Sequence, residues 1–180
     1  ANPGPWNPDQ RPGDNKWTAG IFARNPDTGA ARWFYQYNPH DLFDYDGVNE
    51  NVLMDAIIGG RTRKVLAHPD RNGYLYVIDR ATGEVLSANA FVKVNTIDNI
   101  DLKTGRPVED PASRFMNPKQ PALVAPGPFG AHNWHPMSFS PQTGLVYLPA
   151  QELAMAYLHD PKFKDRPLGF NIGIDATAVM

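Results

Sequence analysis

A strand-like run that ends in a tight turn decides the fold of this chain: residues Tyr74–Gly83, with the sequence YLYVIDRATG. The run is rich in aromatic and β-branched residues, which favour a pleated strand. In the turn, the side chain of Asp79 can accept hydrogen bonds from nearby backbone N–H groups, and Gly83 can adopt a positive φ. This stretch therefore predicts a strand that enters a hairpin.

The same kind of turn recurs along the chain. A polar residue followed by Thr-Gly occurs at Asn25–Gly29, Asp79–Gly83, Asp101–Gly105 and Ser140–Gly144, each time beside a strand-like apolar stretch. Repeated units of strand, turn and strand predict blades of an antiparallel β-propeller, about three to four in this chain. An ordinary β-sandwich uses similar turns, and the turns alone leave that alternative open.

The composition supports an all-β fold in one domain that spans residues 1–180. The chain has 15 Gly, 18 Pro and 11% aromatic residues but only 20% charged residues, which suits short strands and many turns. Its net charge of −2 argues against a nucleic-acid or membrane-surface binder held by basic charge. No apolar run approaches the ~20 residues of a membrane-spanning helix. Because Cys is absent, disulfides and thiolate metal sites are excluded within this stretch.

Several segments carry weaker signals. The chain begins at Ala1 without Met or a signal-like stretch, so we expect a piece of a longer protein. Asp41–Ile58 lacks clean alternation and is expected to be an irregular, functional loop, with a short candidate helix at Val52–Ile57. Lys103–Phe129, rich in Pro and charge, is expected to be a loop. Asn72-Gly73 predicts a type I′ turn before the strand that follows it.

Candidate chemistry begins with the tetrapeptide Asp44-Tyr45-Asp46-Gly47. In an extended segment, Asp44 and Asp46 lie on one face, and Gly47 allows the backbone to turn directly after them. Converging carboxylates repel one another unless a cation lies between them, and hard cations prefer such oxygen ligands. A solvated acidic turn is the alternative.

Other polar residues add candidates with open alternatives. The amide oxygen of Asn2 can ligate a metal or cap a turn. Arg71 can present its donors to a carbonyl or carboxylate, or pair at the surface with Asp70. His132 and His135 have the spacing of a zinc pair, but no third ligand supports one, and two packed or hydrogen-bonded histidines are the alternative. No Gly-x-Ser-x-Gly elbow, phosphate loop or Rossmann fingerprint is present.

Taken together, several strings resemble one family, the pyrroloquinoline quinone (PQQ)-dependent methanol/ethanol dehydrogenases. The matching strings are Asn2–Asn7 (NPGPWN), Arg11–Trp17 (RPGDNKW), Pro39–Asp41 (PHD), Asp44–Asn49 (DYDGVN) and His68–Gly73 (HPDRNG). Residues Ala23–Trp33 also look like the tryptophan docking motif that joins neighbouring blades in this family, with Asn25 where the motif usually has Asp. The resemblance covers nearly the whole chain.

The resemblance implies part of an eight-bladed β-propeller in the periplasm, with PQQ and a metal ion on its axis. It also implies a small primary alcohol as substrate, a cytochrome c-type electron acceptor and a homo-oligomeric full-length protein. By position, Asn2 matches a metal ligand, and Asp44 matches both a metal ligand and the catalytic base. Arg71 matches the arginine that bonds the quinone oxygens, and Asn133 matches an asparagine near the PQQ.

Asp46 bears on the metal. Lanthanide-dependent members of the family carry Asp two positions after the catalytic Asp, where calcium-dependent methanol dehydrogenases carry a small residue. A trivalent cation is better neutralised by one more carboxylate, so Asp46 predicts a lanthanide ion, with Ca²⁺ as the alternative. Residues Ala125–Pro136 look more like the broader alcohol dehydrogenase and quinohaemoprotein branches. A calcium-dependent alcohol dehydrogenase and a non-catalytic propeller scaffold are therefore kept as alternatives.

Overall fold

The structure, a computed structural model, describes residues 7–169 and 171–175, and within them it is all-β. The strands are β1 (Gly20–Arg24), β2 (Ala31–Gln36), β3 (Val52–Ile58), β4 (Arg61–Pro69), β5 (Tyr74–Asp79), β6 (Val85–Ala90), β7 (Ile97–Asp101), β8 (Arg106–Glu109), β9 (Ala122–Val124), β10 (Ser138–Ser140), β11 (Leu145–Tyr147) and β12 (Met155–Tyr157). Two 3₁₀ turns, η1 (Pro8–Gln10) and η2 (Pro111–Arg114), are the helical elements of this part of the chain. The prediction of an all-β fold is confirmed.

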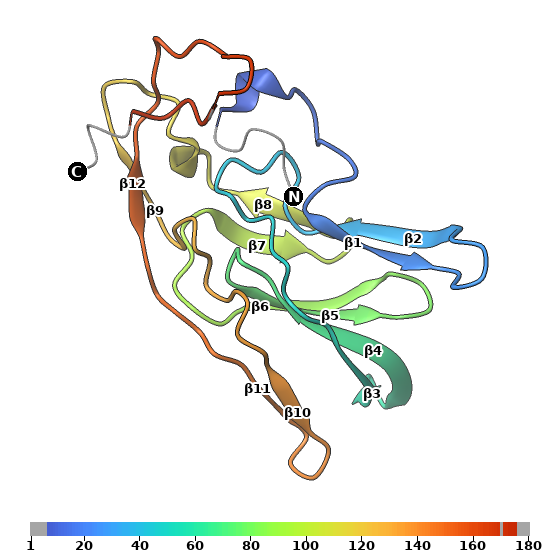
Figure 1. Cartoon of the computed structure of the whole chain (residues 1–180). Helices are drawn as coiled ribbons and strands as arrows, with labels where there is room; N and C mark the ends of the chain where they lie inside the picture. The colour runs from blue at the N-terminus through green and yellow to red at the C-terminus, as the bar shows by residue number, and fades with distance from the viewer. Residues whose placement is uncertain (1–6, 170, 176–180) are drawn as a thin grey trace.

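The centre of the fold is a four-stranded antiparallel sheet in the order β3-β4-β5-β6 (Figure 1). Its first strand shows that the candidate helix at Val52–Ile57 was wrong. Side chains of β3 alternate between half-buried and exposed, and the strand pairs with β4 from Val52 opposite Ala67 to Ile58 opposite Arg61. A partner strand across the Gly59-Gly60 turn outweighs a helical preference that spans less than two turns.

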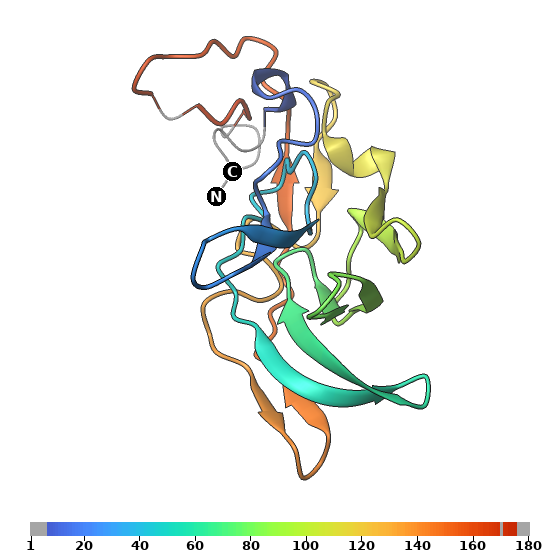
Figure 2. The same cartoon turned by 90° about the vertical axis from the view of Figure 1, so that its right-hand side faces the viewer.

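The other strands form two-stranded pairs: β1 with β2, β7 with β8, β9 with β12, and β10 with β11. The expectation that Lys103–Phe129 is a loop is wrong in part, because this segment contains β8, η2 and β9. Strand β9 pairs with β12, which lies about thirty residues further along the chain, so no local pattern signals it. The β10–β11 hairpin projects away from the other sheets in both views (Figures 1 and 2).

The repeated Thr-Gly turns share one geometry, as predicted. In the turn that starts at Asp79, the N–H groups of Ala81 and Thr82 donate to Asp79 Oδ1, and the N–H of Gly83 donates to the carbonyl of Asp79. The turns that start at Asn25, Asp101 and Ser140 use the same carbonyl bond, and the Gly of each turn has φ between 70° and 80°. One turn design is thus repeated in separate sheets.

The turn at Asn72-Gly73 differs from the prediction. Gly73 has a φ of 91°, but Asn72 is not in the left-handed region that a type I′ turn requires. Asp70 accepts from the N–H of Asn72, and the N–H of Gly73 donates to the carbonyl of Asp70. The loop therefore contains one residue more than the two-residue type I′ turn that was predicted. That additional residue is Arg71, which the turn carries at its tip.

A core of tyrosines and aliphatic side chains joins the sheets. Its buried members are Tyr35, Tyr37, Leu66, Tyr74, Tyr76, Ile78, Val85, Ile97 and Ile100. Trp33 of β2 packs against this core and donates its indole N–H to the carbonyl of Arg80, 3.0 Å away in the β5–β6 turn. A Cβ on Gly83 would lie only 2.8 Å from the Trp33 ring, so the ring needs a glycine there. This contact between sheets is what the docking motif predicts.

A second core supports the loops that follow β2 and β9. It contains Leu42, Phe43, Tyr45, Phe115, Val124, Tyr157 and Ile174. No helix of the described residues is long and apolar enough to cross a membrane.

Candidate active site

Asp44 and Asp46 lie on an irregular loop between β2 and β3. The loop is folded around the buried carboxylate of Asp41, whose Oδ1 accepts from the N–H of Phe43 at 2.9 Å and whose Oδ2 accepts from the N–H of Tyr45 at 2.7 Å. These bonds replace the ladder that a strand would supply. Asp41 therefore fixes the backbone from which the two candidate carboxylates project.

The backbone path through these carboxylates differs from the prediction of an extended segment that turns at Gly47. Asp44 itself has a φ of 67°, whereas Gly47 is not in the left-handed region. A Cβ on Gly47 would lie 3.1 Å from Asn49 Oδ1 and 3.3 Å from Arg71 Cγ, so glycine gives these two side chains room. The turn at Asp44 is strained for a residue with a side chain, although Asp tolerates this region better than most residues.

Arg71 reaches this loop from the β4–β5 turn. Its Nη1 donates to Asp46 Oδ1 at 3.1 Å, and its Nη2 donates to the carbonyl of Pro128 at 2.6 Å. Both side chains of the ion pair are mostly buried, with 13% of Arg71 and 18% of Asp46 exposed. The alternative of a surface pair with Asp70 is wrong, because Asp70 is buried and accepts from Asn38 and from the N–H of Asn72.

A third segment, the loop after β9, completes the site. The N–H of Ala131 donates to the carbonyl of Arg71 at 2.9 Å. Gly130 has a φ of 74°, and a Cβ there would lie 2.6 Å from Arg71 Cβ, so only glycine allows this approach. The same loop carries Asn133, whose Nδ2 donates to the carbonyl of Phe129 at 3.0 Å.

Negative charge is concentrated at the site. Burial, together with the nearby charge of Asp46, raises the pKa of Asp44 to about 6, and Arg71 opposes the shift. Burial raises the pKa of Asp41 to about 7, against the two backbone hydrogen bonds that favour its carboxylate. The pKa of Tyr157 is also raised, by burial and by the charges of Asp41 and Asp44. Such a site gains from a cation or a proton, and Asp44 has the pKa of a useful base.

Buried polar atoms on the three loops have hydrogen-bonding capacity that the described residues do not use. Arg71 Nε is a donor, and the Oδ1 atoms of Asn49 and Asn133 are acceptors; each is buried without a hydrogen-bond partner. Such groups cost about 1–3 kcal/mol each when they stay unpaired. A polar ligand that offers carbonyl and N–H groups fits this set, and the carboxylates of Asp44 and Asp46 fit a hard cation beside it.

The described residues supply only part of a metal site. Among them, no group of three or more His, Asp and Glu side chains is arranged to hold a metal ion. Asp44 and Asp46 are two candidate ligands, and Asn2, the third, lies outside the described residues.

The two histidines do not form a pair. His132 is buried, donates from Nδ1 to the carbonyl of Pro149 at 2.6 Å, and faces Glu50 across 3.5 Å, whereas His135 is exposed. The interpretation as a hydrogen-bonded residue is confirmed for His132, and the zinc pair is not formed.

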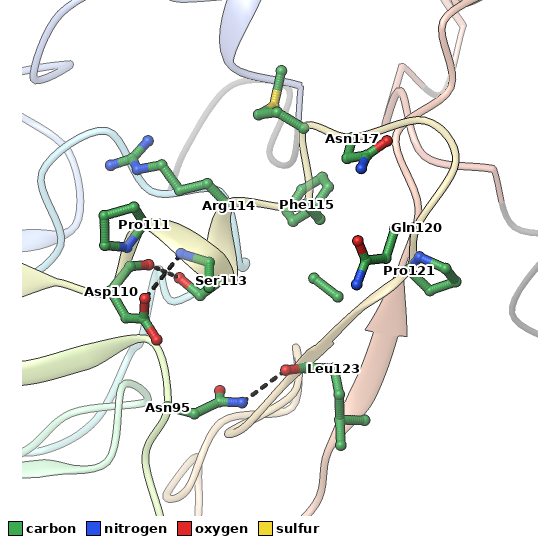
Figure 3. Close-up of a pocket in the computed structure, with 13 residues that line it drawn as sticks. Asn95, Asp110, Pro111, Ser113, Arg114, Phe115, Asn117, Gln120, Pro121 and Leu123 are labelled. Carbon is green, nitrogen blue, oxygen red and sulfur yellow. Dashed lines mark hydrogen bonds between the residues drawn. The ribbon is translucent and has the colours of Figure 1, made fainter.

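A separate cavity of about 690 Å³ lies between η2 and β9 (Figure 3). Asn95 spans one side of it and donates from Nδ2 to the carbonyl of Leu123 at 2.7 Å. Its lining includes Asp110 and Arg114 but neither the candidate carboxylates nor Arg71 or Asn133. The volume of a cavity is a weaker guide to chemistry than converging titratable groups, so the site is placed at the three loops and not here.

Fold and site together define a class: a β-propeller segment whose connecting loops gather two carboxylates and an arginine into one partly buried site. Residues 1–100 match the family described as "PQQ: Glucose/ethanol/alcohol dehydrogenase, beta-propeller domain". The chain belongs to this family, and its fold is part of a β-propeller.

Two curated relatives are similar over most of the chain. The chain is 48% identical over 158 residues to a lanthanide-dependent methanol dehydrogenase from Methylacidiphilum fumariolicum (strain SolV), covering 87% of this chain and 26% of that protein. It is 45% identical over 164 residues to the quinohemoprotein alcohol dehydrogenase ADH IIB from Pseudomonas putida, covering 89% of this chain and 24% of that protein.

The solved structures agree with these relatives. A europium-containing methanol dehydrogenase superposes with a TM-score of 0.83 at 47% identity, over 88% of this chain and 28% of that one. The chain thus spans about a quarter of the length of the proteins it matches.

Proposed function

We propose that this chain is part of the single propeller domain of a PQQ- and metal-dependent dehydrogenase that oxidises a small primary alcohol to its aldehyde. The observation that carries the proposal is the meeting of Asp44, Asp46 and Arg71 from two separate loops, with unpaired buried polar atoms around them. A scaffold propeller has no use for such a concentration of buried charge.

Asp44 is the proposed catalytic base. PQQ, when bound, supplies the group that accepts hydride from the alcohol carbon. Asp44 would take the proton of the alcohol hydroxyl, and burial together with the charge of Asp46, which raises the pKa of Asp44, favours that role. Arg71 would hold the cofactor through its unpaired Nε, and Asn133 through its unpaired Oδ1.

Asn2, Asp44 and Asp46 are the proposed metal ligands from this chain. A second carboxylate suits a trivalent ion, so we propose a lanthanide, with Ca²⁺ as the alternative. In the present structure Arg71 neutralises Asp46, and metal binding would replace part of that neutralisation. Relatives named for lanthanide-dependent methanol oxidation support this choice.

We further propose a periplasmic protein that passes electrons to a cytochrome c-type acceptor and forms a homo-oligomer at full length. Two relatives are quinohemoprotein alcohol dehydrogenases, which supports an acceptor of this kind. These relatives also favour a second candidate, a calcium-dependent alcohol dehydrogenase of broader substrate range.

The proposal is tested by dye-linked alcohol oxidation with the full-length protein and PQQ, comparing La³⁺ with Ca²⁺. Activity with La³⁺ alone supports the proposal in full. Activity with Ca²⁺ keeps the reaction and selects the second candidate. A folded protein that is inactive with both ions contradicts the proposed reaction and favours a scaffold.

The role of Asp46 is tested separately with Asp46→Ala in the same protein. This change removes a carboxylate from the proposed metal site, so we expect the ratio of La³⁺-supported to Ca²⁺-supported activity to fall by about tenfold or more. The matched control is Asp55→Ala, because Asp55 is an exposed carboxylate on β3. An equal loss with both ions, or no loss with either, would contradict the role in metal choice.

A further inference from the structure

Asn38 stands between the loop that carries Asp44 and Asp46 and the turn that carries Arg71. It follows β2 and is buried, with 5% of its surface exposed. Its Nδ2 donates to the carbonyl of Tyr45 at 2.9 Å and to Asp70 Oδ1 at 2.8 Å. One amide nitrogen therefore bonds to two residues. Tyr45 lies between the candidate metal ligands Asp44 and Asp46, and Asp70 directly precedes Arg71.

The other end of the same amide is also used. Asn38 Oδ1 accepts from Asn72 Nδ2 at 2.9 Å, and that nitrogen also donates to the hydroxyl of Tyr76, at 2.9 Å. Asn72 is fully buried, and Asp70 is nearly so. Residues 70 and 72 are thus both tied to Asn38, and Arg71 lies between them.

This arrangement requires an amide. An aspartate at position 38 would set a carboxylate against Asp70 and against the carbonyl of Tyr45, so three acceptors would face one another. A shorter or apolar side chain would leave these buried groups without partners, which is costly. The two loops would then lose the hydrogen bonds to Asn38 that join them, although Asp44, Asp46 and Arg71 would themselves be unchanged.

We propose that Asn38 is a positioning residue that sets Asp44 and Asp46 relative to Arg71. The expected effect of Asn38 on catalysis rests on the proposed function. Its effect on the positions of the two loops rests on the hydrogen bonds alone. A displacement of about 1 Å at a reacting group can cost about a hundredfold in rate. Loss of the Asn38 hydrogen bonds should therefore lower kcat more than it lowers the stability of the fold.

The test compares Asn38→Ser with Asn95→Ser in the full-length protein loaded with PQQ and metal. Asn95 is the matched control because its amide also ties two segments, donating to the carbonyl of Leu123 and accepting from the N–H of Ala125. For Asn38→Ser we expect kcat to fall by about a hundredfold with little change in KM for the alcohol; for Asn95→Ser we expect kcat within about threefold of the wild type. Equal losses of kcat in the two variants would overturn the proposal.

A double variant separates the two ties. In N38D/D70N the link between positions 38 and 70 is restored with donor and acceptor exchanged, but the carboxylate introduced at position 38 cannot donate to the carbonyl of Tyr45. We expect the thermal stability to recover in part from that of Asn38→Asp, because the carbonyl of Tyr45 still lacks its donor, and we expect kcat to stay low. Full recovery of kcat would show that the tie to Tyr45 has no positioning role.

Hydrogen–deuterium exchange gives a readout that needs no activity. In Asn38→Ser, amides of residues 43–47 and 71–73 should exchange faster than in the wild type, and in Asn95→Ser the faster amides should lie at 122–126. Unchanged exchange in both loops would overturn the proposal. If the wild-type protein oxidises no alcohol but the exchange pattern appears, the proposed function fails and the structural tie stands.

Discussion

The β3–β6 sheet and the loops of the candidate site are stabilised in opposite ways. The sheet is stabilised by ladders of backbone hydrogen bonds and by an apolar and tyrosine core, with regular turns at its hairpins. The site has no strand between residues 37 and 51 and is stabilised by side chains that bond backbone groups, chiefly Asp41 and Asn38.

The difference extends to charge. The sheet's ion pair joins Arg63 of β4 to Asp79 of β5 and is partly exposed, so it contributes little to the free energy of unfolding. At the site, Asp41, Asp44 and Asp46 lie close enough together that Asp46 raises the pKa of Asp44. Clustered buried carboxylates lower stability and are kept where the chemistry needs them. Substitutions at the site should therefore change kcat, and substitutions in the sheet should change the free energy of unfolding.

The largest expected effect is on activity and comes from Asp44→Asn. Asparagine has nearly the same shape and also tolerates the φ of 67°, but it cannot accept the alcohol proton. We expect kcat of the full-length enzyme to fall by about a thousandfold, with the unfolding midpoint within a few degrees of the wild type. Steady-state kinetics and thermal unfolding measure the two quantities. Retention of most of the activity would remove Asp44 as the base.

The opposite result is expected in the sheet, for Ile78→Ala. Ile78 on β5 is completely buried, and its truncation leaves a cavity in the core. We expect the free energy of unfolding to fall by about 3 kcal/mol, roughly a hundredfold in the folding equilibrium. Activity per folded molecule should not change. Denaturant unfolding measures the first quantity, and a large loss of kcat in the folded fraction would show that the two regions are not independent.

The sheet was more predictable from sequence than the site, for a physical reason. The Thr-Gly turns and the aromatic and β-branched run Tyr74–Ile78 are local signals, and the structure confirms the turns and the strand that they predict. The pairing of β9 with β12 and the contact of Asn38 with Asp70 join residues far apart in the chain, so no local pattern encodes them. These contacts can be identified only from the three-dimensional structure.

The sequence pattern singled out Asp44, Asp46 and Arg71, and the resemblance to a family gave them roles, but neither predicted the geometry of the site. Asp44 was expected in an extended segment and instead adopts the left-handed region, because Asp41 captures the N–H groups on both sides of it. The carbonyl of Pro128, which binds Arg71, carried no signal, since every residue has a carbonyl. Spacing identifies side chains, but backbone partners appear only in three dimensions.

The charge difference between the regions predicts pH-dependent metal uptake. The pKa of Asp44 is raised to about 6 before metal binds, so as pH falls through that value Asp44 takes up a proton that the metal must displace. We expect the affinity of the metal-free full-length protein for La³⁺ to fall by up to about tenfold per pH unit below pH 6 and to level off above it. Titration calorimetry from pH 5 to pH 8 measures the affinity. In Asp44→Asn this dependence should disappear, and its persistence would assign the proton to another group.

The smallest expected effect is at the contact between sheets, in Trp33→Phe. Phenylalanine keeps an aromatic ring near Gly83 but loses the indole N–H that donates to the carbonyl of Arg80. We expect a loss of about 1 kcal/mol in the free energy of unfolding, the net contribution of one such hydrogen bond, and no change in kcat. Trp17→Phe is the control, because Trp17 is 63% exposed and its ring contacts among the described residues are with Phe22 and Phe34 of the β1–β2 hairpin. If the two variants lose the same stability, the indole bond does not join the sheets, and the apolar core alone holds β2 against β5 and β6.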